Sequence, residues 1–111
     1  MVQFEANLDR SFGALSDPTR RAILMRLGRS EASITELASG FDMTLTGLKK
    51  HVQILEDAGL VRTQKVGRVR TCKLGPQRLE DVGKWISNYH HMLEQRLDAL
   101  GEFLERTKGT P

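Results

Sequence analysis

A concentrated group of basic side chains lies in the middle of the sequence. Residues 49–73 carry seven lysines and arginines and two carboxylates, a net charge of +5, whereas residues 1–48 and 76–111 each carry a net charge of −1. The whole chain has a formal net charge of +3, so all of the positive excess lies in this block. Such a block is typical of a surface that binds a polyanion, and equally of a solvated charged surface.

The first residues of this block fall on one face of an expected helix. At 100° per residue, leucine and valine side chains line one face of residues 45–58, and polar side chains with suitable donors line the other: Thr46, Lys49, Lys50 and Gln53. Lysine can donate to guanine or neutralise a phosphate, and glutamine can form two hydrogen bonds with adenine. His51 lies at the edge of the apolar face, where it is either a boundary residue or a phosphate contact.

Capping signals define the elements that position these side chains. Ser33 and Glu36 form a capping box that opens a short helix at 34–40, and Thr44 is an N-cap for the helix at 45–58. Gly59 ends the second helix. Two short helices joined by three residues predict a helix-turn-helix over residues 34–58, whose second helix enters the major groove of DNA.

A basic hairpin follows the second helix. Residues 60–63 and 69–74 are rich in β-forming residues, and Lys65-Val66-Gly67-Arg68 is expected to form the turn between them. This pattern predicts a wing over residues 60–74, next to the helix-turn-helix. Together with the N-terminal end of the helix, where free N–H groups favour phosphate, the wing completes the expected DNA-binding set: Thr44, Thr46, Lys49, Lys50, His51, Gln53, Lys65, Arg68 and Arg70.

The sequence predicts a dimerisation helix at each end of the chain. Apolar residues recur at helical spacing in residues 1–14, and a second helix is expected at 18–28, opened by Asp17 and Pro18. The last helix, at 77–106, is about 45 Å long, whereas a compact domain of this size has a radius of gyration of about 13 Å. Its apolar seam therefore predicts a homodimer, with these interface residues: Phe4, Leu8, Phe12, Trp85, Tyr89, Leu93, Leu97 and Leu100.

The order of several motifs resembles the ArsR family of winged helix-turn-helix regulators. The motifs are LSDPTRRAILMRL, SITELA, KKHVQILEDAGLV and GRVRTCKL, and the resemblance covers about residues 8–104. It implies a homodimer that binds a palindromic operator and represses transcription. The Trp85 region resembles the subgroup that lacks a metal-sensing site. Many members have a serine where this chain has Lys49, so the resemblance leaves the operator preference open.

A metal- or ligand-responsive repressor of the same family is the alternative function. The stretch 34–39 has no cysteine, whereas metal-sensing members often carry a Cys-x-Cys pair there. His90, His91 and Glu94 lie together on the last helix, but no second pair of ligands precedes them. We therefore expect no metal and no cofactor. The sequence does not determine whether a small-molecule inducer acts on the protein, at the dimer seam or elsewhere.

The remaining features favour a single non-enzymatic domain with five helices and a small β-hairpin. The 111 residues suit one domain, and they show no nucleophile elbow, phosphate-cradling glycine loop or set of four metal ligands. No apolar run approaches the length of a membrane span, and the N-terminus lacks a signal-peptide layout. The single Cys72 is expected to pack in a strand. These features predict a cytoplasmic protein without a membrane partner.

Overall fold

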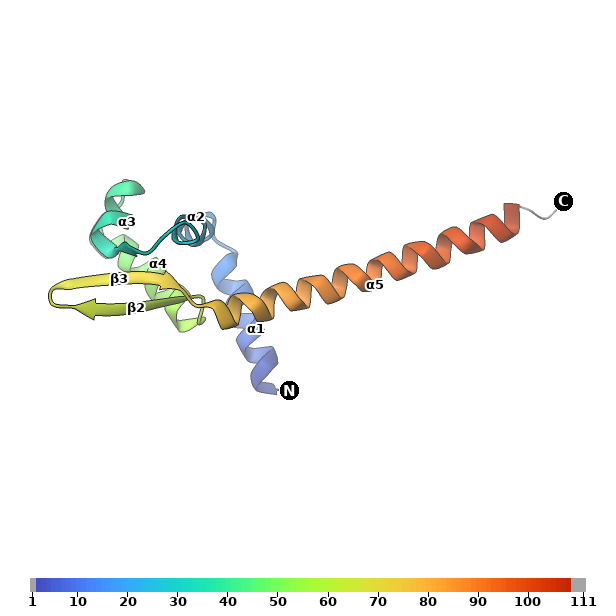
Figure 1. Cartoon of the computed structure of the whole chain (residues 1–111), viewed down its shortest axis with the longest axis horizontal. Helices are drawn as coiled ribbons and strands as arrows, with labels where there is room; N and C mark the ends of the chain where they lie inside the picture. The colour runs from blue at the N-terminus through green and yellow to red at the C-terminus, as the bar shows by residue number, and fades with distance from the viewer. Residues whose placement is uncertain (1, 109–111) are drawn as a thin grey trace.

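The computed structural model describes residues 2–108, and the side chains of residues 5–107. Five helices and three short strands follow one another along the chain: α1 (Val2–Leu15), α2 (Pro18–Leu27), β1 (Ala32–Ser33), α3 (Ile34–Gly40), α4 (Leu45–Asp57), β2 (Val61–Val66), β3 (Val69–Leu74) and α5 (Pro76–Lys108). The predicted mainly helical, winged helix-turn-helix fold is confirmed (Figure 1). The side chain of Phe4, a predicted interface residue, lies outside the described side chains.

The helices begin where the sequence places their caps. The Asp17 carboxylate accepts a hydrogen bond from the Arg20 amide at 3.0 Å, and Pro18 opens α2. Ser33 and Glu36 form the capping box of α3. The Thr44 hydroxyl accepts from the amide three residues later and opens α4. Each cap satisfies backbone N–H groups that have no partner within the helix, so these starts are fixed locally.

The wing is part of a three-stranded antiparallel sheet with the order β1-β3-β2. The two-residue strand β1 was not predicted, and it pairs Ala32 with Cys72. The predicted turn at residues 65–68 was wrong in one respect, because β2 runs on to Val66. Lys65 therefore lies in the strand, opposite Arg70. The loop is only two residues long, and its Gly67 has a φ of +64°, which a glycine adopts without strain.

The core lies between the helices and the base of the wing. Leucine and isoleucine side chains from α2, α3 and α4 meet there with Leu60 and with Cys72 of β3, and several are fully buried: Ile23, Leu37, Leu48, Leu55 and Leu60. At the base of the wing two glycines allow the chain to pass close to itself. A Cβ atom on Gly75 would lie 2.3 Å from the Gly59 carbonyl oxygen. The segment that leaves α4 and the segment that enters α5 can therefore lie this close together only because residue 75 is a glycine.

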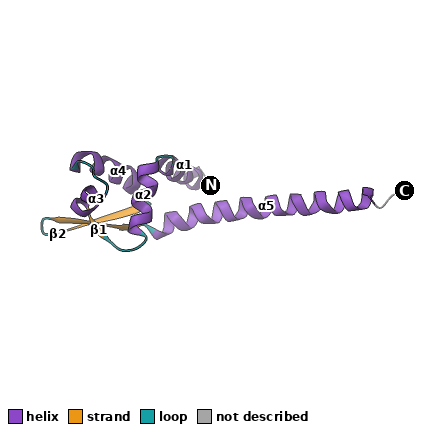
Figure 2. Ribbon diagram, turned by 90° about the horizontal axis from the view of Figure 1, so that it is seen from above, coloured by secondary structure: helices purple, strands orange, loops and turns teal. Residues whose placement is uncertain are grey.

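Helix α5 leaves the domain and projects from it as a single arm. The molecule measures 76 × 32 × 20 Å, and its radius of gyration is 20.1 Å, well above the roughly 13 Å of a compact chain of this length. Figures 1 and 2 show that only the start of α5 lies near α1 and the wing. Within residues 2–108, no helix combines the length and apolar character that crossing a bilayer requires.

Candidate nucleic-acid interface

Helix α4 has one apolar face and one polar face, as the sequence predicts. Its leucine and valine side chains at 48, 52 and 55 are at most 3% exposed and pack in the core. The four residues expected to contact DNA are all exposed on the other side: Thr46, Lys49, Lys50 and Gln53. Since burial of the apolar face fixes the rotation of the helix, it also holds the polar face outward.

The start of α4 is shaped around its cap. The Gly47 amide donates to the Thr44 hydroxyl at 3.1 Å. A side chain on Gly47 would lie 3.1 Å from that hydroxyl and 3.6 Å from the Met43 methyl group. The glycine therefore leaves room for the cap, and the first turn of α4 stays open toward the solvent.

The one glutamine of the polar face is held by a carboxylate. The Gln53 side-chain amide donates to Asp57 at 2.8 Å, one helical turn further along α4. An ionised carboxylate only accepts hydrogen bonds, so the nitrogen end of the amide must face Asp57. The oxygen of the amide and its second N–H stay available to a base edge.

The basic residues of the wing lie close together across the hairpin. Lys65 on β2 is directly opposite Arg70 on β3, and Arg68 follows Gly67 in the loop. All three are exposed. Together with Lys49 of α4, they line one cleft between the wing and the helix-turn-helix. The structure thus brings together four of the nine predicted DNA-binding residues.

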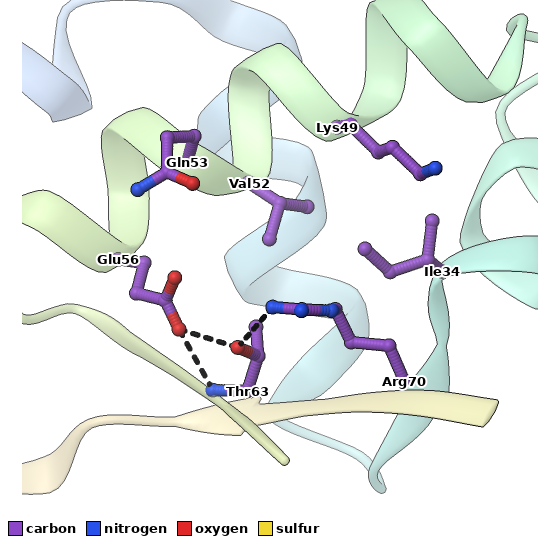
Figure 3. Close-up of a pocket in the computed structure, with 7 residues that line it drawn as sticks. All are labelled: Ile34, Lys49, Val52, Gln53, Glu56, Thr63 and Arg70. Carbon is purple, nitrogen blue, oxygen red and sulfur yellow. Dashed lines mark hydrogen bonds between the residues drawn. The ribbon is translucent and has the colours of Figure 1, made fainter. Parts of the chain in front are cut away.

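A chain of hydrogen bonds joins the wing to α4 (Figure 3). The Glu56 carboxylate accepts from the Thr63 amide at 3.2 Å and also from the Thr63 hydroxyl. Arg70 donates to the same hydroxyl at 3.2 Å. Glu56, which was not among the predicted site residues, therefore links α4 directly to the wing. No local signal pointed to it, because Glu56 and Thr63 lie in different elements.

His51 faces the body of the domain, away from Lys49 and the wing. Its ring nitrogen lies 3.4 Å from the Arg20 guanidinium and 3.9 Å from the Asp17 carboxylate. The amide of Arg20 donates to Asp17, which is the main reason that the pKa of Asp17 is lowered. Arg20 also donates to the Ala14 carbonyl at 2.7 Å. His51 thus joins α4 to the start of α2, and a phosphate contact would need an approach from that side.

The residues predicted for the dimer interface form an aromatic group between α1 and α5 and an exposed stripe along α5. Phe12 of α1 lies edge-on to Trp85, and Trp85 stacks on Tyr89, with ring centroids 5.4 and 5.5 Å apart. Leu8 is already buried within the chain. The aromatic rings stay substantially exposed, and so does the rest of the α5 stripe, whose exposed fractions range from 38% to 66%: Ile86, Met92, Leu93, Leu97, Leu100, Phe103 and Leu104.

The candidate metal ligands on α5 form a simple surface pair. Of the three residues His90, His91 and Glu94, the structure pairs His90 with Glu94 at 2.9 Å. The two side chains are 72% and 59% exposed, respectively. Among the described residues, no three histidine, cysteine, aspartate or glutamate side chains are placed to share a metal ion.

Known proteins with related sequences are transcriptional regulators. A family described as a helix-turn-helix domain matches residues 15–64. The HTH-type transcriptional regulator YuzN of Bacillus subtilis (strain 168) is 38% identical over 88 residues, which span 72% of this chain and 96% of YuzN. The transcriptional repressor SdpR of the same bacterium is 28% identical over 82 residues, spanning 74% of this chain and 91% of SdpR.

Solved structures show the same fold. The crystal structure of RHA00566, an ArsR family transcriptional regulator, matches with a TM-score of 0.74 at 44% identity, covering 81% of this chain and 93% of that one. The homodimeric winged helix-turn-helix domain of Mb0332 from Mycobacterium bovis matches with a TM-score of 0.66 and covers 88% of each chain. At 22% identity, this second match is a likeness of fold.

Proposed function

This chain belongs to the ArsR family of helix-turn-helix transcriptional regulators, and we propose that it is a homodimeric repressor that binds a palindromic operator. Its relatives are DNA-binding regulators, not enzymes. The repressor role is supported by SdpR, which is named as a transcriptional repressor. A repressor of this kind blocks transcription by occupying its operator.

The observation that carries the proposal is the position of one basic surface. The polar face of α4 is exposed beside the wing, and Lys49 lines a cleft together with Lys65, Arg68 and Arg70. The positive excess of the whole chain lies in the block that forms this surface. A protein–DNA interface needs such a surface, because neutralising phosphates and releasing their counterions supplies much of the binding free energy.

We propose that α4 enters the major groove with its N-terminal half. Thr46, Lys50 and Gln53 then reach base edges or nearby phosphates, and the wing holds the flanking backbone. The two half-sites should lie about one helical turn apart, as the two-fold symmetry of a dimer requires. Of the predicted contacts, His51 does not line the basic cleft and instead lies beside Asp17 and Arg20.

We propose further that residues 1–14 and 77–106 form the dimer interface around the domain of residues 34–74. The exposed apolar stripe of α5 supports this arrangement, since a monomer would leave it in water. The named homodimeric state of Mb0332 is consistent with it. The protein should work without a metal, because the stretch equivalent to a thiol site has no cysteine.

The experiment is a gel shift with DNA from upstream of the gene itself. The expected result is a complex of two chains per duplex that survives an excess of unrelated DNA of equal length. A scrambled duplex of the same composition is the matched control. Equal affinity for both duplexes at the same salt concentration would overturn the proposal that the protein reads an operator.

A further inference from the structure

Four basic side chains converge on one cleft between the wing and the helix-turn-helix. The cleft has a volume of about 430 Å³, and its charged lining residues are all cationic: Lys49, Lys65, Arg68 and Arg70. Its remaining wall comes from residues 33–35, Leu45 and Val69. Lys49 and Arg70 also line an adjoining hollow of about 220 Å³, so these two cations lie where the two spaces meet (Figure 3).

Among the described residues, none of these four cations forms an ion pair. Lys65 and Arg70 are directly opposite each other in the hairpin, a like-charge pairing that destabilises a sheet. Within residues 5–107, Lys49, Lys65 and Arg68 make no side-chain hydrogen bond or ion pair, and Arg70 donates to the neutral Thr63 hydroxyl. The carboxylate of the adjoining hollow, Glu56, already accepts two hydrogen bonds from Thr63. The cleft therefore suits an anion.

We propose that this cleft binds one phosphate group of the DNA backbone, and that Lys49 contacts this phosphate in place of a base edge. The inference rests on the proposed function and refines it. A phosphate offers several acceptor oxygens in a small volume, and a guanidinium group matches its geometry. Lys49 shares both hollows with Arg70, whereas its neighbour Lys50 lines neither. The two adjacent lysines thus have different roles, and the wing and α4 grip the same phosphate.

The neighbouring lysines allow a matched test in the full chain. Lys49→Gln should weaken binding to the operator and to random duplex by the same factor. Since one phosphate contact is lost, the deficit should shrink about threefold from about 50 to about 200 mM salt. Lys49→Gln combined with Arg70→Gln should lose less than the product of the two single losses, because both substitutions act on one phosphate. Lys50→Gln combined with Arg70→Gln should give the full product.

Two results would overturn the proposal. One is a loss with Lys49→Gln on the operator but not on random DNA, which would make Lys49 a base reader. The other is that both double variants, Lys49→Gln/Arg70→Gln and Lys50→Gln/Arg70→Gln, lose affinity by the full product of their two single losses. If the wild-type protein formed no DNA complex at all, the proposed function would fail separately. The cleft would then be tested only by the titration with inorganic phosphate that is described next.

An NMR titration of the DNA-free protein with inorganic phosphate, against sodium chloride of equal ionic strength, distinguishes the source of the phosphate. Saturable shifts in α4 and β3 that disappear in Lys49→Gln/Arg70→Gln would establish the cleft as a site for free phosphate as well. Absence of saturation, together with the uniform loss on DNA, would assign the cleft to the DNA backbone. Absence of both effects would refute the site.

Discussion

The Glu56 carboxylate at the end of α4 accepts hydrogen bonds from both the backbone amide and the hydroxyl of Thr63 in the wing. The Thr63 hydroxyl in turn accepts from Arg70, so a single threonine joins the helix to both strands of the hairpin. The base of the wing is held by the pairing of β3 with β1 and by the burial of Cys72 in the core. The Glu56–Thr63 contact adds a direct link between α4 and the wing, beside the surface that is proposed to meet DNA.

Thr63→Val should therefore loosen the wing while keeping its shape. The variant retains the backbone amide bond to Glu56 but loses the hydroxyl, so we expect the free energy of unfolding to fall by about 1 kcal/mol. DNA affinity should fall on all sequences, since the wing is misplaced. Thr71→Val is the control, because the Thr71 hydroxyl has no hydrogen-bond partner among the described residues. Chemical denaturation and gel shifts would measure both; equal effects of the two variants would contradict the role of Thr63.

Arg68→Ala should remove one contact between the loop of the wing and the phosphate backbone of DNA. We expect a loss of affinity that is nearly equal on operator and random DNA, and a salt dependence whose slope is smaller by about 0.9. Arg62→Ala is the control, because Arg62 lies at the base of the wing on the side of Gln77 and Arg78. Fluorescence anisotropy over a salt series would measure the slope. An unchanged slope in Arg68→Ala would mean that the wing does not contact phosphate.

Gln53→Ala should change the DNA sequence that the protein prefers. The Gln53 amide is held by Asp57 with its oxygen and one N–H free, which suits the two hydrogen bonds of an adenine edge. We expect a loss of about 1–3 kcal/mol on the operator and little change on random DNA. Gln64→Ala, an exposed glutamine of β2, is the matched control. If both variants lost the same affinity on both duplexes, Gln53 would have no base-reading role.

Cys72 should make the protein less stable in alkaline solution. Burial raises the pKa of the Cys72 thiol from its usual value of 9.0 to about 11, and the nearby Glu56 charge adds to this. The folded state thus holds the proton more tightly, so this contribution to stability is complete below about pH 9 and is lost as the pH rises toward 11. Relative to Cys72→Ala, the wild type should lose about 1 kcal/mol between pH 8 and pH 10. Unfolding curves at the two pH values would measure the difference, and fast thiol modification of the native protein would contradict the burial.

The helix-turn-helix could be predicted because its boundaries are fixed by local chemistry. Ser33 with Glu36 and Thr44 satisfy backbone groups within a few residues, and Gly59 adopts a φ of +75° that ends α4. Apolar spacing then fixed the rotation of α4. These signals need no knowledge of the rest of the fold, and the exposed residues of the polar face followed from them.

The remaining features depend on contacts between distant parts of the chain. Strand β1 has two residues and exists only because it pairs with β3, so its sequence carries too short a pattern to be recognised. The Glu56–Thr63 contact and the position of His51 beside Asp17 likewise arise from packing. The Gln53–Asp57 pair is the exception, since its spacing of four residues on one helix could have revealed it.

The exposed stripe of α5 supports a last prediction, on the dimer. Leu97 is 66% exposed in the single chain, and burying a leucine contributes about 2 kcal/mol. In a symmetric dimer Leu97→Glu acts twice, so the dissociation constant should rise on the order of a thousandfold. Met25→Glu is the control, because Met25 is 74% exposed on α2, away from this stripe. Sedimentation at micromolar concentration should show a wild-type dimer, a dimeric Met25→Glu and a monomeric Leu97→Glu. A wild-type monomer would refute the interface, and a dimeric Leu97→Glu would place it elsewhere on the chain.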